Sequence, residues 1–402
     1  MNKYLLILSA LLVSITSFGQ KIKNEKVEFR YVQYPSAPFP KAERLYKIET
    51  ETTSAERAEE MKKNYEEAKA KIDARYEADL ADLRRRQAQY DSASAGAKIA
   101  TALLLGDTRP TEAEVKKGSY PKKPMYPKEI DGSTQVNNNI KIEGLTKSDD
   151  ANVTIKFSFN GMDYTDYKIV GDSLKKVQYT MKNPVKMTVT AASGEVLYDA
   201  YVPGSNDFTT ITWGESTSYS KLSKAWGPER EKNYRSNEKS LLSKNMKAAN
   251  SILNSKFGYV VKEMDLKVFM GASKKDIYPE HAEAFSQVSM GYNMMENEDD
   301  YADAKEYFDS AIAAWEETLK EKDPKNKKAK VNAKVTGGMH FNLASAYLFT
   351  KDFKKVKMHT TQLKILGEGK FERQLKQIDD FIDSYKSRYE AYQKAVAMND
   401  EQ

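Results

Sequence analysis

The strongest constraint in this sequence is a long interval without proline, between Pro40 and Pro110. Within it, residues 53–105 consist mainly of Ala, Glu, Lys, Arg and Leu, which have the highest intrinsic helix propensities. Thr53 and Glu56 have the spacing of a capping box, which marks the start of a helix. We therefore expect a long N-terminal helical excursion over 53–105.

Apolar residues recur at steps of three and four along this helix and form one narrow stripe. Its members are Met61, Tyr65, Ala68, Ile72, Tyr76, Leu80 and Leu83, with Gln87 continuing the spacing. A stripe this narrow on a charged rod predicts a single partner helix, and self-association through the long helix is an open alternative. Ser92–Gly96 predicts a break. The apolar segment after it, Ala97–Gly106, is interpreted as a short helix covering a core, with a membrane-touching or partner-binding tip as the alternative.

Two similar proline-rich stretches, Tyr34–Pro40 and Tyr120–Pro127, lie on either side of this helix. Val27–Tyr34 and Arg44–Glu51 read as strands, so the first stretch is a stiff connection between them. We interpret both stretches as struts that pin the base of the excursion. A polyproline-type ligand for another domain is the less favoured alternative. Residues 20–135 thus form an N-terminal region around the long helix.

The pattern changes at residues 136–220, where short β-branched and aromatic runs are separated by Gly, Asn, Asp and Pro. Ser193-Gly194 between two such runs predicts a hairpin. Six or seven strands at this spacing predict a small immunoglobulin-like β-sandwich. Trp213 and nearby tyrosines are expected in its core, with a sugar-stacking face as the alternative. Residues 221–276 read as a connector with one helix over 237–254 and a strand.

The first 19 residues have the features of a secretory signal peptide. Lys3 precedes a short apolar run, and Ser17 and Gly19 suit a cleavage after Gly19. The chain has no cysteine, so it has neither disulfides nor a lipidation site of the bacterial lipoprotein type. These features predict an exported bacterial envelope protein, periplasmic or outer-membrane-associated, with peripheral membrane contact left open. No segment is long and apolar enough to be expected to span a bilayer.

Composition narrows the function classes. A length of 402 residues predicts two to four domains, and 30% charged with 40% hydrophobic residues predicts exposed helices joined to ordinary cores. The net charge of +6 is a mild excess that does not indicate a nucleic-acid partner.

The C-terminal region, residues 277–402, carries a family resemblance between about 280 and 366. Val288 and Tyr292 are followed by Ala304, Phe308 and Ala311, and a second segment repeats the pattern. The matching positions of that segment are Leu343, Ala344, Tyr347, Val356, Thr360 and Leu363. This pattern resembles the tetratricopeptide repeat (TPR) and implies paired helices with a protein-binding groove. The complete expectation is an α+β multidomain protein: helical excursion, β-sandwich and TPR-like helical domain.

No catalytic motif or cofactor-binding pattern is present. The three histidines, His281, His340 and His359, are not in a metalloprotease motif, so we expect no metal, no cofactor and no enzymatic activity. His340 and His359 are expected on facing helices, in a packing role.

The leading hypothesis is a non-enzymatic adaptor or scaffold that binds another envelope protein or protein complex through the TPR-like groove. The expected groove residues are Gln287, Met290, Asn293, Asn342 and Ser345. A basic loop with Lys325, Lys327 and Lys328 is a second candidate contact for acidic partners. The alternatives are a periplasmic chaperone or holdase that uses the long helix, and a carbohydrate-binding or cell-wall-associated protein.

Overall fold

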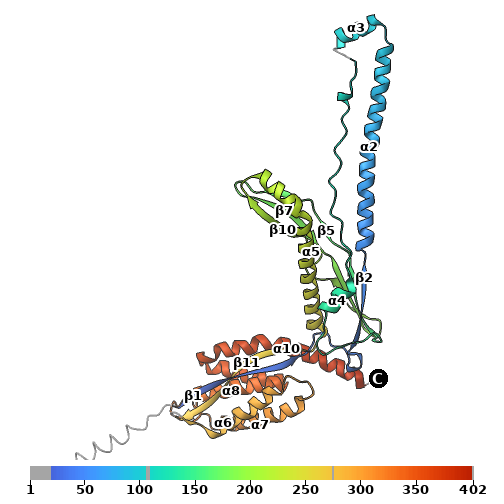
Figure 1. Cartoon of the computed structure of the whole chain (residues 1–402). Coiled ribbons are helices and arrows are strands. Elements are labelled where there is room, and N and C mark those ends of the chain that lie inside the picture. Colours follow the sequence, from blue (N-terminus) through green and yellow to red (C-terminus); the bar gives the residue numbers. More distant parts are fainter. Residues whose placement is uncertain (1–19, 106–108, 274–275, 401–402) are drawn as a thin grey trace, which may run out of the picture. The chain divides into compact units, whose positions relative to one another are not determined.

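The protein has an α+β fold, with 53% of the residues in helices and 22% in strands. The computed structural model describes residues 20–105, 109–273 and 276–400 (Figure 1), so the expected signal peptide lies outside the described part. The chain divides into two units that each contain several segments. Unit 1 contains Met1–Tyr46, Lys141–Ala151 and Asn250–Gln402, and unit 2 contains Lys47–Ile140 and Asn152–Ala249.

Unit 1 is built on two strands from distant parts of the chain, β1 (Lys21–Gln33) and β11 (Val260–Ser273). They pair antiparallel over their full length, from Lys21 opposite Ala272 to Gln33 opposite Val260. The other elements are the 3₁₀ turns η1 (Lys41–Glu43) and η3 (Gly369–Phe371), strand β12 (Asp276–Ile277), and the helices α6 (Pro279–Asn293), α7 (Tyr301–Lys320), α8 (Ala333–Phe349), α9 (Phe353–Leu366) and α10 (Glu372–Asp400).

Helix α8 is the centre of this unit, because every residue from Val335 to Phe349 is buried. It contacts α7 and α9 as well as both long strands, so its whole circumference is covered. On β1, the alternate residues Val27, Phe29 and Tyr31 face the same core.

Helices α6–α9 lie where the repeat resemblance placed paired helices. The expected packing positions Val288, Tyr292, Ala304 and Phe308 are buried. Gly291 lets the first pair approach closely, since a Cβ there would lie 3.1 Å from the Ala304 carbonyl oxygen. The repeat assignment itself stays a prediction.

Unit 2 contains a long antiparallel meander packed on one helix, α5 (Tyr219–Phe257), which continues into unit 1. The strands are β4 (Val153–Phe159), β5 (Asp163–Tyr164), β6 (Lys168–Val170), β7 (Lys175–Lys182), β8 (Val185–Thr190), β9 (Val196–Tyr201) and β10 (Thr209–Ser216). Strand β2 (Leu45–Thr52), shared by the units, joins β4 to the short β3 (Thr146–Lys147), and α4 (Gly132–Asn139) precedes them.

Three chain segments each contribute a strand to both sheets of unit 2. Strands β4, β8 and β9 belong to one sheet, and β5, β7 and β10, on the same three segments, belong to the other. Backbone hydrogen bonds bridge the gap between them, from Asn160 N–H to Pro184 C=O and from Val202 N–H to Val185 C=O. Helix α5 supplies Leu222, Trp226, Tyr234 and Leu241 to the core around Tyr179. In the part of the meander that contains β7 and β10, the apolar face is therefore covered by a helix, where the expected sandwich would have a second sheet.

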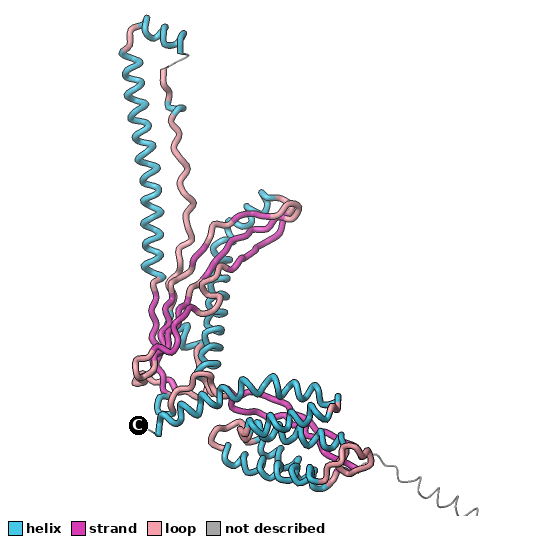
Figure 2. The backbone as a smooth tube through the Cα atoms, turned by 180° about the vertical axis from the view of Figure 1, so that it is seen from behind, coloured by secondary structure: helices cyan, strands magenta, loops and turns pink. Residues whose placement is uncertain are grey.

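The long N-terminal helix α2 (Ser54–Ser92) is present as expected. It ends before a second helix, α3 (Ala95–Leu105), begins. Figures 1 and 2 show α2 extending from β2 and an extended segment returning beside it. This return contains one short turn, η2 (Glu112–Glu114). Among the described residues, none of the helices combines the length and apolar character that crossing a membrane requires.

The two Tyr-Pro stretches have partners in different units. Tyr34 is buried in unit 1, where its ring stacks on Tyr392 at 4.4 Å and its hydroxyl accepts from Lys351 Nζ at 3.0 Å. Tyr120 belongs to unit 2 and donates to Asp73 Oδ1 on α2 at 2.6 Å. Because Asp73 lies well inside α2, the second stretch runs along the helix and does not only pin its base.

Candidate functional site

The residues expected to line a groove in the C-terminal helices divide into two groups. On α6, Met290 is 47% exposed and Asn293 is exposed, while Gln287 is half-buried. On α8, Asn342 and Ser345 are each only 2% exposed. The structure therefore does not bring the five residues together on an open surface.

The burial of Asn342 and Ser345 has a clear physical cause. Asn342 donates from Nδ2 to the Phe269 carbonyl at 2.7 Å and accepts the Phe269 N–H at 2.9 Å. Ser345 donates to the Phe341 carbonyl within α8. Both side chains satisfy buried backbone groups, so neither is available to a partner, and the expected groove is wrong at these two positions.

The expected basic loop is on the surface. Lys325, Lys327 and Lys328 are exposed, and none of them forms an ion pair with another described residue. The loop is held by the Asp323 N–H, which donates to the Val331 carbonyl, and by Asn332, whose side chain caps α8. These lysines remain available for contact with an acidic surface.

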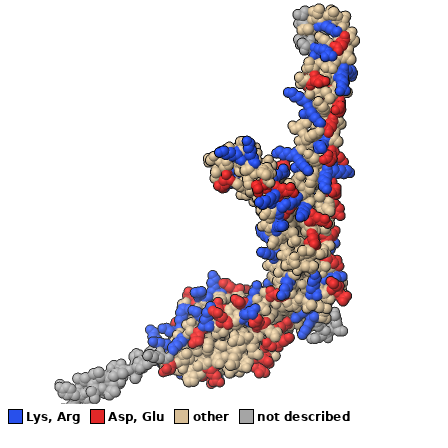
Figure 3. Space-filling model, viewed as in Figure 1, with Lys and Arg blue, Asp and Glu red and all other residues tan. Residues whose placement is uncertain are grey.

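The α2–α3 arm, defined as the described residues 54–105 and 109–127, is largely exposed. Of the 39 residues of α2, only Ser54 and Leu83 are buried. All eight positions of the expected stripe are buried or half-buried, whereas most of the positions between them are exposed. Figure 3 shows basic and acidic side chains interspersed along the arm. The stripe is thus confirmed as the covered side of the helix.

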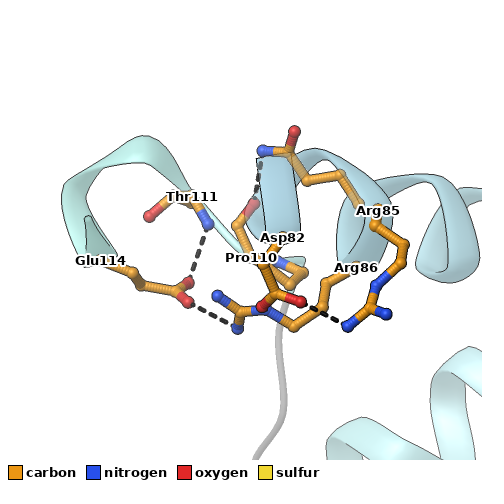
Figure 4. Close-up of polar contacts among 7 residues, drawn as sticks. Asp82, Arg85, Arg86, Pro110, Thr111 and Glu114 are labelled. Carbon is orange, nitrogen blue, oxygen red and sulfur yellow. Dashed lines mark hydrogen bonds and ion pairs between the residues drawn. The ribbon is translucent and has the colours of Figure 1, made fainter. Parts of the chain in front are cut away.

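The partner of the stripe is the returning segment and not a second helix. We call residues 109–127 the strap. Near its start, Gln87 Nε2 donates to the Pro110 carbonyl at 2.8 Å, and Arg86 Nη1 pairs with Glu114 Oε2 at 3.2 Å (Figure 4). Glu114 also accepts the Thr111 N–H at 2.8 Å, which fixes the η2 turn.

Further along, the strap is held by charges and aromatic rings. Asp73 on α2 accepts from both Lys117 Nζ at 2.5 Å and the Tyr120 hydroxyl at 2.6 Å, and these two donors hold its carboxyl pKa below the usual range. Lys117 also lies over the ring of Tyr76, at 5.8 Å from its centroid. The strap therefore covers the apolar stripe of α2. The surface from which self-association through α2 was predicted is occupied by the same chain.

The far end of the arm carries the apolar helix α3. Its sequence is AGAKIATALLL, and Ile99 is 60% exposed. Among the α3 side chains that the structure describes, all are exposed except Lys98, which is half-buried and donates to the Asp91 carbonyl. Arg109 closes the end of the arm by a two-point ion pair with Asp91, at 3.0 and 2.8 Å. The described part of α3 therefore covers no core.

Unit 2 also contains a cavity of 670 Å³ beside α5, which the sequence did not indicate. Its deepest polar group is Glu238, 9% exposed, which accepts from the Tyr164 hydroxyl and from Arg235 Nη1 at 2.7 Å. Ile130, Met162 and Leu242 form apolar walls.

Burial raises the pKa of Glu238 to about 7, while the positive charge of Lys128 acts in the opposite direction. A buried carboxyl with a raised pKa in a cavity is a feature of many functional sites. The cavity lining nevertheless contains no serine, cysteine or histidine. It also mixes both signs of charge, so it does not select a ligand class.

The expected approach of His340 and His359 is present, with their Nδ1 atoms 2.9 Å apart. Burial lowers the pKa of each to about 4, so both rings are neutral at pH 7. Within the described part of the chain, no group of three or more metal-ligating side chains is present.

Comparisons with known proteins give no match: no protein-family description, no curated protein and no solved structure matches the chain.

Proposed function

We propose that this chain is a non-enzymatic adaptor of a bacterial envelope and that it binds another protein with the α3 end of its α2–α3 arm. The observation that carries this proposal is the exposure of α3, whose described apolar side chains contact no core. Exposed apolar surface on an extended element is typical of protein-binding sites.

The arm also supports this role by its internal structure. The strap is held against α2 at several points along the helix, by the ion pairs that involve Asp91, Glu114 and Asp73. Because the strap of the same chain packs on α2, the arm can expose its tip without pairing with α2 of a second copy. The export that the first 19 residues predict would place this tip outside the cytoplasm.

The helical repeats have a smaller part in this proposal than the sequence suggested. The exposed α6 residues Met290 and Asn293 and the basic loop around Lys327 are retained as secondary contacts. Trp213 and Tyr179, two of the aromatic residues that motivated sugar binding, pack against Trp226 in unit 2 at ring distances of 5.0 and 5.8 Å. Among the aromatic residues of this group only Tyr201 is exposed, so they form no continuous open face. For that reason carbohydrate binding is not proposed.

A chaperone or holdase is the second candidate, because an exposed apolar tip can also hold unfolded clients. The two functions differ in stoichiometry: an adaptor retains one or two partners in fixed ratio, whereas a chaperone binds many clients in small amounts.

Affinity isolation from cross-linked envelopes tests the proposal. Ile99→Glu should reduce recovery of the partner at least tenfold, because burial of an isoleucine contributes about 2 kcal/mol and a buried glutamate costs more. Ile365→Glu is the matched control, since Ile365 is 73% exposed on α9 in unit 1. Equal recovery with both variants would refute binding through α3.

A further inference from the structure

One stretch of unit 2, which contains two edge strands, differs in charge from the rest of the chain. The whole sequence contains 64 Lys and Arg residues, yet residues 187–220 contain none. The same stretch contains four carboxylates, at Glu195, Asp199, Asp207 and Glu215. The stretch contains β9 and β10, each an edge strand of one of the two unit 2 sheets, so neither of these edge strands carries a positive charge.

Strand β9 is the last strand of its sheet, in the order β3-β2-β4-β8-β9. It pairs with β8 in an antiparallel register that places Tyr201 opposite Lys186 and Asp199 opposite Thr188. The Val202 N–H donates to the Val185 carbonyl, so this is a hydrogen-bonded pair. Because such pairs alternate along an antiparallel ladder, Asp199 and Tyr201 direct their N–H and C=O groups toward the open edge.

The side chains of β9 do not protect this edge. Val196 is 56% exposed and Tyr201 is 42% exposed, and the only charged residue of the strand is Asp199. Edge strands that avoid pairing usually carry lysines or bulges. Strand β1 contains Lys21, Lys23 and Lys26, and β10 has an irregular register between Trp213 and Ser216. The pairing of β9 with β8 also shifts register, between Val189 and Thr190, so the regular part of the β9 edge is Tyr198–Tyr201.

The outer edge of β11 shows how this protein closes an edge that it does not use. There the Asn342 side chain forms hydrogen bonds with both the N–H and the C=O of Phe269. No backbone hydrogen bond from a loop reaches Asp199 or Tyr201 among the described residues.

The local charges identify the kind of segment that fits. Asp199 is paired with Lys186 at 2.9 Å, whereas Glu195 and Asp207 are exposed and form no ion pair within the described chain. Both open carboxylates flank β9 in the sequence, one before it and one after it.

We infer that β9 is a docking edge for an extended, basic segment of a partner protein, which adds to the sheet as a further strand. Only another polypeptide backbone offers alternating donors and acceptors at the spacing of this edge. Apolar side chains of the added strand would lie beside Val196 and Tyr201, and lysines or arginines would face Glu195 and Asp207. This surface is independent of the α3 tip, and either one can be lost without the other.

The test uses the full mature chain and two labelled peptides of alternating residues, (Lys-Val)4 and (Glu-Val)4. Binding is followed by fluorescence anisotropy at low and high salt. The informative variant is Asp199→Pro, because proline is tolerated at an edge position whose N–H faces solvent, and the β8–β9 ladder stays intact. Asp199→Asn is the matched control, since it removes the same charge and keeps the N–H. Circular dichroism and the unfolding midpoint show whether each variant is folded.

We expect (Lys-Val)4 to bind the wild-type chain with a submillimolar Kd. Its Kd should rise at least tenfold for Asp199→Pro and should change by no more than about threefold for Asp199→Asn. (Glu-Val)4 should bind at least tenfold more weakly than (Lys-Val)4 at low salt. The inference is overturned if (Lys-Val)4 does not bind at 1 mM, or if both peptides bind equally. It is also overturned if a folded Asp199→Pro variant binds as the wild type does. Sedimentation that shows a dimer lost in Asp199→Pro would make a second copy the occupant, and would overturn the assignment to a different partner.

Discussion

Asn342 on α8 and Phe269 on β11 are joined by two hydrogen bonds between a side-chain amide and a peptide unit, at 2.7 and 2.9 Å. The amide replaces the neighbouring strand that β11 lacks at this point. A polar residue inside a fully buried helix thus closes the edge of the central sheet in unit 1. Its role is structural, and this explains why it does not belong to a groove.

Replacing Asn342 by alanine should lower the free energy of unfolding by about 2–4 kcal/mol, because it leaves the buried N–H and C=O of Phe269 without partners. Urea denaturation of the purified protein measures the effect. Ser345→Ala is the control and should cost less than about 1 kcal/mol, since Ser345 bonds only within α8. Equal losses for the two variants would contradict the edge-closing role.

The close contact between α8 and the sheet makes a second stability prediction. A Cβ on Gly338 would lie 2.2 Å from Ile22 Cδ1 and 2.8 Å from Phe269 Cβ. Gly338→Ala should therefore destabilise the protein by about 1–3 kcal/mol, although alanine favours helix. At Gly96 in α3, a Cβ meets no atom within 4 Å, so Gly96→Ala should be neutral or slightly stabilising. A stabilised Gly338→Ala variant would show that this packing is not tight.

Stability should fall in mild acid because of the buried histidine pair. Burial lowers the pKa of His340 and His359 from 6.5 to about 4 in the folded state. The unfolded chain therefore binds more protons between pH 6.5 and 4, and the free energy of unfolding decreases as the pH falls through this window. The loss should reach up to about 3 kcal/mol per ring.

The double variant His340→Gln/His359→Gln isolates this effect from the carboxylates, because glutamine does not titrate. Unfolding midpoints at pH 7.5 and pH 4.5 should differ less in the double variant than in the wild type. The histidine account fails if both proteins show the same pH dependence.

The strap should loosen when its anchor on α2 is removed. Asp73→Ala deletes the acceptor of both Lys117 and Tyr120, so tryptic cleavage after Lys116, Lys117 and Lys122 should become several-fold faster. The global unfolding midpoint should change little, because these contacts are on the surface. Asp79→Ala, on an exposed side of the same helix, is the control. Unchanged cleavage would mean that other contacts hold the strap.

Local patterns in the sequence predict the elements of this fold well. Helix propensity and the three-four spacing identify α2 and its covered side, and Ser92–Gly96 marks its break from α3. The turn at Ser193-Gly194 is likewise confirmed by the pairing of β8 with β9 and by the positive φ of 87° at Gly194. Each of these features is decided by neighbours in the sequence.

What covers each element depends on distant residues and was not predictable. Strand alternation shows that one face of a sheet is buried, but it does not show that α5 rather than a second sheet covers it. Pro228 obscured the first half of α5, so only 237–254 was expected as helix, whereas the helix spans Tyr219–Phe257. The contacts of Glu238 with the Tyr164 hydroxyl and of Asp73 with Lys117 join segments whose proximity has no signature in the sequence.

The central claim, that the α3 tip binds a specific partner, is tested most directly by a photo-crosslinking amino acid at position 99 in intact cells. The proposed adaptor should give one or two discrete adducts that are absent when the same group is placed at position 365. A broad smear of many adducts from position 99 would indicate a chaperone. No adduct at position 99, with the protein exported and folded, would contradict the claim.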